Sequence, residues 1–152
     1  MKPQTTFSVR RIRAKDLENG VFECLSNLTT VGDIKNDLAK ARRILRQIME
    51  DAGYNIFVCV KDGSTEIIGM ATLFVEQKLI HDGGKVGHVE DVVTKKGFEG
   101  MGVASTVVNE ALKLAKRIGC YKVILDCSEK NAPFYEKLNF KRQAISMRYD
   151  MQ

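Results

Sequence analysis

The stretch of sequence that decides the fold is His88–Ala104, which reads HVEDVVTKKGFEGMGVA. It starts with the apolar pattern of a strand, turns at Lys95–Gly97 and passes through a glycine-rich segment into a helical repeat. Glycines let the chain turn tightly, so several main-chain N–H groups can point at one anion. The helix that starts near Gly102 adds roughly half a positive charge at its N-terminus. The segment is therefore suited to bind a pyrophosphate.

Two common phosphate motifs are excluded by the glycine order of this loop. The pattern G-x-G-x-x-G of dinucleotide-binding proteins is absent, and no Gly-Lys-Ser/Thr of a nucleoside-triphosphate loop follows. A plain strand-to-helix turn would also give such a segment, so the loop alone does not establish a ligand site.

On the C-terminal side of the loop, apolar residues at helical spacing predict a helix over Val103–Ile118. Tyr121–Cys127 is nearly all apolar, which predicts a strand covered on both faces. Asn131 is expected to cap a short helix, and Asn139 is suited to the left-handed residue at its end. Lys141–Tyr149 alternates weakly and predicts a final strand.

On the N-terminal side, Phe7–Arg13 alternates apolar and basic residues, as a strand with one solvent-exposed face does. Asp16 is expected to cap a short helix, and Asp33 a longer helix that ends near Gly53. Gly69 indicates a bulge within its strand. The remaining predicted strands are Asn55–Lys61, Glu66–Ile80 and Lys85–Thr94. The sum is a single α/β domain over residues 1–152, in which the helix after the glycine loop joins two parallel strands.

Composition excludes several classes of protein. Of the 152 residues, 44% are hydrophobic and 28% charged, as in globular domains and unlike disordered chains. No apolar run is long enough for a membrane span and no signal peptide is visible, which predicts a cytoplasmic protein. The net charge of +5 suits a phosphorylated ligand, but no run of five like charges supports nucleic-acid binding. The four cysteines have no metal-ligand spacing and are expected to be reduced thiols.

The stretch His88–Ala104 resembles the central motif of the GNAT family of N-acetyltransferases, whose pyrophosphate loop runs Gln/Arg-x-x-Gly-x-Gly/Ala. The resemblance covers nearly the whole chain in the same order of elements. It implies the GNAT fold, in which helices flank a mixed, mostly antiparallel sheet that splays at the acetyl-CoA site. Glu99 departs from the family pattern, because it places an acid where the loop has Gln or Arg.

Four longer matches resemble the branch of this family that acetylates D-glucosamine 6-phosphate. They are Lys78–His81 (KLIH), His88–Val93 (HVEDVV), Cys120–Cys127 (CYKVILDC) and Glu129–Lys137 (EKNAPFYEK). The branch implies acetyl-CoA as co-substrate, no metal and direct attack by the amine in a ternary complex. It also implies a homodimer and a place in UDP-N-acetylglucosamine biosynthesis.

The resemblance assigns residues to the coenzyme. Main-chain groups of Val92 and Val93 are expected to pair with the pantetheine and polarise the acetyl carbonyl, while Tyr135 gives a proton to the departing thiolate. The full set of expected coenzyme contacts is Asp91, Val92, Val93, Glu99, Gly100, Met101, Gly102, Val103, Ala104, Asn131, Phe134 and Tyr135.

The resemblance also assigns residues to the acceptor. Glu90, Asp91 and Asp126 are expected near the sugar, with Asp126 favoured to orient the amine or take its proton and Glu90 as a second catalytic candidate. In a regular strand Glu90 and Asp91 face opposite ways, a restriction that a bulge would relax. The expected sugar and phosphate contacts are Thr29, Lys78, His81 and Arg148. Asp150 stands where relatives carry a phosphate-binding arginine, so Arg148 is expected to act across a dimer interface.

Two other functions stay open from the sequence. One is a GNAT acetyltransferase for a different amine, such as a polyamine or a protein N-terminus, which would gain nothing from Lys78 and His81. The other is a non-catalytic acetyl-CoA-binding module, favoured by Glu99 and by the missing terminal arginine.

Overall fold

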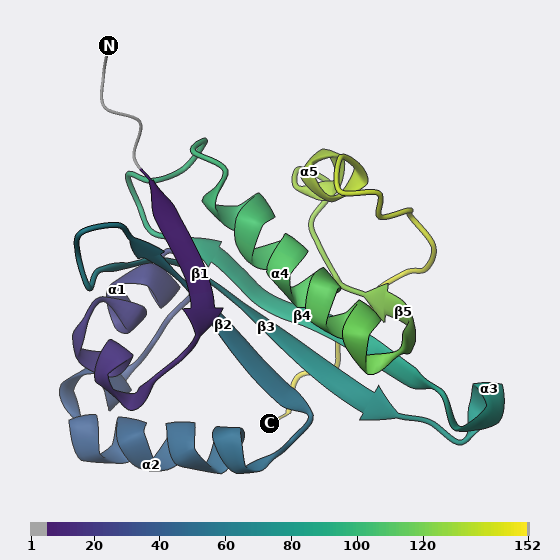
Figure 1. The fold of residues 1–152 in the computed structure, drawn as a ribbon, viewed down its shortest axis with the longest axis horizontal. Helices are drawn as coiled ribbons and strands as arrows, with labels where there is room; N and C mark the ends of the chain where they lie inside the picture. Colours follow the sequence, from purple (N-terminus) through teal and green to yellow (C-terminus); the bar gives the residue numbers. More distant parts are fainter. Residues whose placement is uncertain (1–5, 152) are drawn as a thin grey trace.

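A computed structural model describes residues 6–151 of the chain. Five strands form one sheet in the order β1-β2-β3-β4-β5, antiparallel throughout except for the parallel pair β4 and β5 (Figure 1). The strands are β1 (Phe7–Arg11), β2 (Tyr54–Lys61), β3 (Ile67–Gln77), β4 (Lys85–Thr94) and β5 (Cys120–Ile124). The predicted mixed, mostly antiparallel sheet is confirmed.

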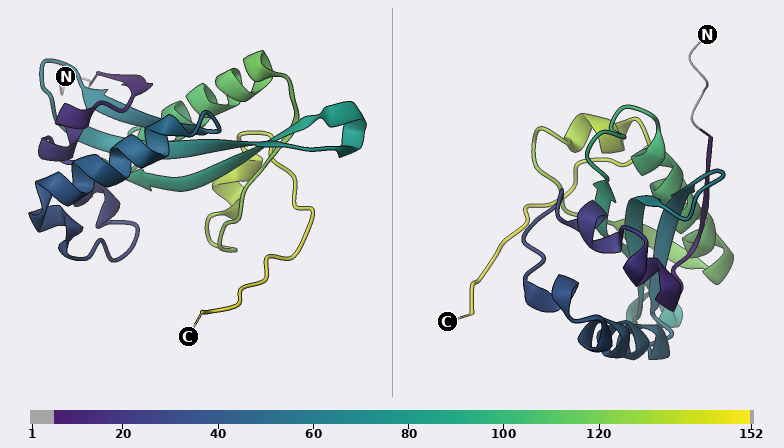
Figure 2. Two further views of the ribbon diagram at one scale, coloured as in Figure 1. Left: turned by 90° about the horizontal axis from the view of Figure 1, so that it is seen from below. Right: turned by 90° about the vertical axis from the view of Figure 1, so that its left-hand side faces the viewer.

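Helices cover both faces of this sheet (Figure 2). The helical segments are η1 (Ala14–Glu18), α1 (Val21–Leu25), η2 (Asp33–Asn36), α2 (Leu38–Glu50), α3 (Ile80–Gly83), α4 (Val103–Ile118) and α5 (Ala132–Glu136). Side chains alternate along a strand, so the consecutive residues Phe57 and Val58 enter different cores. Phe57 packs with α4, whereas Val58 packs with Cys24 of α1 and Leu45 of α2. Among residues 6–151, no helix combines the length and apolar content needed to cross a membrane.

Gly69 of β3 lies beside the predicted bulge, which is confirmed. Cys59 pairs with Gly69 and the next β2 residue pairs with Ile67, which leaves Ile68 as the extra residue. A Cβ atom on Gly69 would overlap the side chain of Val103, at the start of α4. The glycine therefore lets the helix approach β3 closely.

The predicted cap at Asp16 is wrong. The helical segment breaks at Gly20, whose φ is 101°, and Asp16 belongs to η1. Its buried carboxylate accepts two hydrogen bonds from the Arg10 guanidinium, both at 2.8 Å, and one from the main-chain N–H of Arg13 at 2.7 Å. A buried carboxylate needs such a partner, and this requirement overrides its capping preference.

Two further boundaries differ from the sequence predictions. Asp33 begins only the short η2 segment, and Asp37 caps the long helix by accepting from the N–H of Lys40 at 2.9 Å. The third strand ends at Gln77 instead of Ile80, because the chain there enters the short turn α3.

The C-terminal part differs most. The predicted strand Tyr121–Cys127 ends at Ile124 and is not covered on both faces, since Tyr121, Lys122 and Ile124 are exposed. The predicted strand Lys141–Tyr149 is absent, and every residue from 141 to 151 is exposed. Within the described chain this tail meets no neighbouring strand, so it has no partner for main-chain pairing.

Candidate active site

The sheet opens between β4 and β5. Their parallel pairing runs from Lys85 to His88 on β4 and ends at Ile124 on β5, although β4 continues to Thr94 (Figure 1). The last part of β4 therefore has β3 on one side and no strand on the other. This is the splay that the sequence predicted.

Main-chain groups of Val92 face the open edge. The N–H of Lys95 donates to the carbonyl of Ile68 on β3 at 2.8 Å, and Val93 pairs with Met70 of the same strand. Because main-chain groups alternate in direction along a strand, those of Val92 point away from β3. An extended ligand at the opening can pair with them as a neighbouring strand would.

Three carboxylates gather at the same part of β4. Asp91 and Val92 lie together opposite the single residue Ala71, and Asp91 has a φ of 51°. This bulge breaks the strict alternation of Glu90 and Asp91, and both side chains are exposed. Partial desolvation by neighbouring atoms raises the pKa of Glu90, and the charges of Asp91 and Asp126 raise it further. The fold thus brings together the three acids that the sequence assigned to the acceptor.

The glycine loop follows directly after β4. Gly97, Gly100 and Gly102 have φ values of 93°, 75° and 83°, a region that only glycine adopts readily. Around Gly97 and Gly100 a Cβ atom would meet no atom within 4 Å, so the main chain is open to a ligand. Gly102 directly precedes α4. Val103, the first residue of this helix, is buried in the core, whereas Met101, before the helix, is exposed. These residues fit a pyrophosphate: open main-chain amides stand at the N-terminus of a long helix.

Glu99 and Ala104 complete the predicted loop set. The Glu99 carboxylate turns back to accept a hydrogen bond from the N–H of Gly97 at 2.7 Å, and Ala104 is half-buried in the first turn of α4. Hydrogen bonds from the main-chain amides of Glu99 itself and of Gly97 lower the pKa of this carboxyl. Glu99 is therefore charged and directed into its own turn.

Tyr135 lies half-buried on α5. Its ring packs edge-on against Phe134 at 4.9 Å and Phe140 at 5.8 Å between centroids. Burial raises the pKa of the Tyr135 hydroxyl, and the neighbouring Cys127 thiol raises it further. The hydroxyl is therefore protonated at neutral pH and can donate a hydrogen bond or a proton.

The ends of α5 agree only in part with the sequence. Asn131 occupies the position before the helix, but its side chain makes no capping hydrogen bond, so the predicted cap is wrong. Asn139 is left-handed as predicted, with a φ of 68°. Arg142 donates to Glu136 and to Glu129, both at 2.6 Å, and ties this helix to the loop before it.

Each of the three predicted phosphate contacts already has a partner within the chain. Lys78 pairs with Glu76 at 2.8 Å, the His81 ring stacks on Tyr121 at 4.2 Å between centroids, and Arg148 pairs with Asp150 at 2.6 Å. Arg148 lies on the exposed tail.

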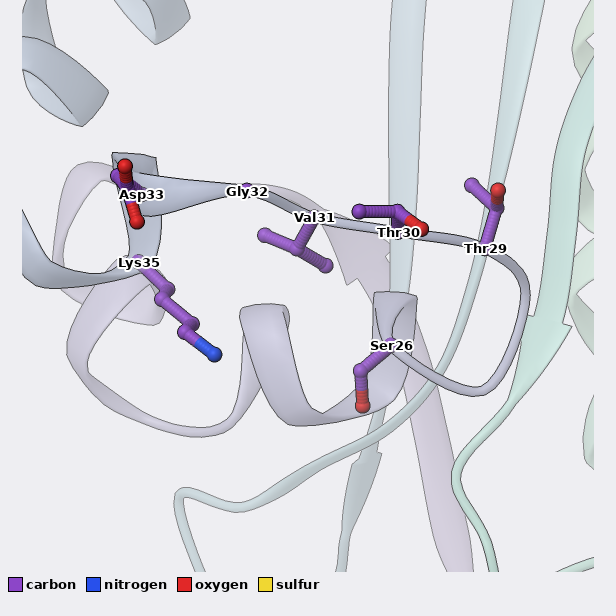
Figure 3. A pocket seen from close by; sticks show the side chains of 7 residues that line it. All are labelled: Ser26, Thr29, Thr30, Val31, Gly32, Asp33 and Lys35. Carbon is purple, nitrogen blue, oxygen red and sulfur yellow. The ribbon is translucent and has the colours of Figure 1, made fainter.

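Thr29 lies on the loop between α1 and η2. This loop borders a hollow of about 520 Å³, whose lining side chains Figure 3 shows. The hollow is lined by Ser26, Thr29, Thr30, Val31, Gly32, Asp33 and Lys35. Thr29 is the only predicted site residue among them. Within residues 6–151, no group of three or more His, Cys, Asp or Glu side chains is arranged to hold a metal ion.

The sequence profile of the acetyltransferase (GNAT) family matches residues 21–140, which is most of the chain. The protein belongs to the GNAT family. A glucosamine 6-phosphate N-acetyltransferase of Candida albicans is 37% identical over 148 residues, covering 97% of each chain. Glucosamine 6-phosphate N-acetyltransferase 1 of Dictyostelium discoideum is 34% identical, covering 92% of this chain and 88% of its own.

Solved structures agree with this membership. The crystal structure of glucosamine-6-phosphate N-acetyltransferase from Arabidopsis thaliana superposes with a TM-score of 0.87 at 33% identity, covering 97% of this chain and 99% of that one. The splayed sheet and the glycine loop before α4 are thus features of a GNAT fold.

Sequence reasoning missed several residues of this region. Asn27, at the end of α1, donates to the carbonyl of Thr94 at 2.7 Å, and Glu76 binds both Lys78 and His88. Cys127 lies beside Tyr135. No local pattern signals these roles, because each depends on contacts formed only in the folded chain.

Proposed function

We propose that this GNAT protein transfers the acetyl group of acetyl-CoA to the amine of D-glucosamine 6-phosphate, giving N-acetyl-D-glucosamine 6-phosphate and CoA. The observation that carries this proposal is the identity of 34–37% to two relatives named for that acceptor, over 92–97% of the chain. Family membership supports acetyl-CoA as the donor. The proposal treats residues 1–152 as one domain and requires no metal.

Binding of the donor is assigned to the main chain. The open amides from Gly100 to Ala104 and the N-terminal end of α4 would hold the pyrophosphate. The open edge of β4 would pair with the pantetheine arm, and an N–H of Val92 would polarise the acetyl carbonyl. Asn131 and Phe134 would flank the coenzyme from α5.

The proton transfers are assigned to the acids of β4 and to Tyr135. The attacking amine must lose a proton, and the pKa of Glu90 is raised by desolvation and by the charges of Asp91 and Asp126. Glu90 or Asp126 would therefore accept this proton as a general base. The protonated hydroxyl of Tyr135 would supply a proton to the thiolate as it leaves. Thr29 and Asp91 would contact the sugar.

Direct product analysis tests the reaction. The purified chain is incubated with acetyl-CoA and a panel of amines (glucosamine 6-phosphate, glucosamine, spermidine and an N-terminal peptide), and the acetylated products are separated by chromatography. We expect N-acetylglucosamine 6-phosphate to form fastest. If another amine alone is acetylated, the acceptor is wrong although the family chemistry stands. If acetyl-CoA binds and no amine is acetylated, the chain is a binding module.

A different amine is favoured by one observation. Lys78 and Arg148 each pair with an acid of the same chain, so a phosphate would have to compete with Glu76 and Asp150 for them. The charge reversal Lys78→Glu separates the two readings. It should raise KM for glucosamine 6-phosphate at least tenfold if the phosphate binds there, and it should leave activity unchanged if the acceptor carries no phosphate.

The same proposal includes a homodimer. The exposed tail carries Ile145, Met147 and Tyr149, which are 84–92% exposed. The outer edge of β5 has no strand beside it within residues 6–151. A second subunit would cover both features and would bring Arg148 toward the partner's site. A cytoplasmic location and a place in UDP-N-acetylglucosamine biosynthesis belong to the proposal as well.

A further inference from the structure

Two segments that are far apart in the sequence meet at the base of the glycine loop. The side-chain amide nitrogen of Asn27 donates to the carbonyl of Thr94 at 2.7 Å and to the Glu99 carboxylate at 3.3 Å. The other Glu99 oxygen accepts from the N–H of Gly97 at 2.7 Å. The two N–H bonds of one primary amide thus serve two acceptors at the two ends of a single turn.

Asn27 stands on a fixed support. Its main-chain N–H donates to the carbonyl of Cys24 at 3.1 Å, within the turn that ends α1. Cys24 and Val21 of this short helix are buried in the core beneath the sheet. The position of the Asn27 amide is therefore set by the core, and the turn from Thr94 to Glu99 is held against it.

The hydrogen bond from Asn27 to Thr94 gives a partner to a main-chain carbonyl that pairs with no strand. By alternation from Lys95, whose N–H donates to β3, the carbonyl of Thr94 points to the open edge of β4. Phe98 closes the turn by donating to the carbonyl of Lys95 at 3.0 Å. Glu99 then returns its side chain to Gly97, away from the N-terminus of α4, where a carboxylate would repel a pyrophosphate.

We propose that Asn27 and Glu99 form a clasp that holds the glycine loop in its anion-binding shape, and that Glu99 acts as a positioning residue without touching the coenzyme. An acid can then stand at this position of the loop, because its carboxylate serves the clasp. The clasp gives Asn27 a role in coenzyme affinity although it precedes the loop by about seventy residues. This inference rests on the proposed use of acetyl-CoA.

Calorimetric titration with CoA tests the clasp. Asn27→Ala and Glu99→Ala should each weaken CoA binding about tenfold, the loss expected for one hydrogen bond to a charged group. Because both changes break the same contact, the double variant should bind only slightly more weakly than either single variant. In turnover, KM for acetyl-CoA should rise in these variants while kcat stays near that of the parent.

The conservative variant Glu99→Gln distinguishes the clasp from simple repulsion. Its amide oxygen can still accept from Gly97, but its amide nitrogen cannot accept from Asn27, so CoA binding should lie between that of the parent and that of Glu99→Ala, whereas simple repulsion predicts tighter binding as the negative charge is lost. The matched control is Asn109→Ala, on the exposed side of α4, which should leave CoA binding unchanged. Amide hydrogen exchange gives a readout without ligand: the Gly97 N–H should exchange faster in Glu99→Ala than in Glu99→Gln.

Three results would overturn the inference. If Glu99→Ala and Glu99→Gln both tighten CoA binding, Glu99 acts only by repelling the ligand. If Asn27→Ala binds CoA as tightly as the parent, the clasp does not shape the loop. If the parent protein itself binds no CoA, both the proposed function and the clasp are wrong. If the parent binds CoA and the variants bind it equally well, only the clasp is wrong.

Discussion

Burial of the Tyr135 hydroxyl decides what this side chain can do at neutral pH. Because its pKa is raised, the hydroxyl stays protonated and suits a proton donor. Tyr135→Phe should lower kcat by about 100-fold, the lower end of the usual range for a general acid, while CoA binding stays unchanged. Steady-state kinetics and calorimetry measure the two effects. Tyr54→Phe, at the exposed start of β2, is the control, and equal turnover of Tyr135→Phe and parent would remove the assigned role.

The three carboxylates on β4 and beyond β5 predict a pH effect. A raised pKa means that Glu90 loses its basic form at a higher pH than an ordinary glutamate as the solution is acidified. Turnover should therefore fall on the acid side as pH drops through this raised pKa. Asp126→Asn removes one neighbouring negative charge and lowers the pKa of Glu90, so the acid limb should move to lower pH. Desolvation still raises this pKa in the variant, so the pKa should move only part of the way back to that of an ordinary glutamate.

The pH profile of normalised kcat/KM measures this shift. Asp150→Asn, on the exposed tail, should leave the limb in place. A limb that stays unmoved in Asp126→Asn, or that persists in Glu90→Gln, would assign the titration to another group.

The conformation of a single residue could be predicted from the sequence where local backbone preferences determine it. Asn139 is left-handed as its place after a short helix suggests, because Asn tolerates that conformation. Asp16 misled the prediction, since its burial beside Arg10 depends on how η1 packs on the sheet. The contact of Asn27 with Glu99 joins residues 72 apart and carries no local signal.

At the scale of elements, the contact of β3 with α4 depends on Gly69. A methyl group there would overlap Val103, so Gly69→Ala should destabilise the fold by about 1–3 kcal/mol through overpacking. Chemical denaturation measures the loss. The double variant with Val103→Ala should recover part of it, because the smaller side chain leaves room. Purely additive losses in the double variant would contradict the overlap.

Elements with local signals were predicted well, and elements that depend on neighbours were not. β4 and α4 span Lys85–Thr94 and Val103–Ile118 as predicted, because apolar periodicity and flanking glycines define their ends. β5 is shorter and more exposed than its apolar run suggested. Its apolar run predicts a strand that is covered on both faces. Within the described residues, however, β5 is an edge strand, and Tyr121 and Ile124 are exposed.

At the scale of the whole molecule, the apolar tail predicts the state of assembly. Ile145 and Met147 are 89% and 92% exposed, although isolated large apolar side chains gain free energy from burial. In the proposed homodimer they would lie against a second subunit. Ile145→Asp combined with Met147→Asp should therefore convert the dimer to a monomer, because the interface would have to bury two unpaired charges.

Light scattering coupled to size-exclusion chromatography measures the mass of each species. Asn109→Asp, an added charge on the exposed side of α4, should leave the dimer intact. A monomeric parent, or a double variant that keeps the dimer mass, would contradict the assigned interface. Loss of activity together with the dimer would support the contribution of Arg148 to the partner's site.

The thiol beside Tyr135 has a practical consequence for assays. Burial raises the pKa of Cys24 and of Cys59 to about 12, which makes both inert toward alkylating and disulfide reagents. Cys127 is exposed, so a dye that counts liberated CoA by its sulfhydryl will also label the protein next to Tyr135, the proposed proton donor. The colour change in a continuous assay would then report both the CoA released and the modification of Cys127 by the dye. The variant Cys127→Ser would remove the second contribution.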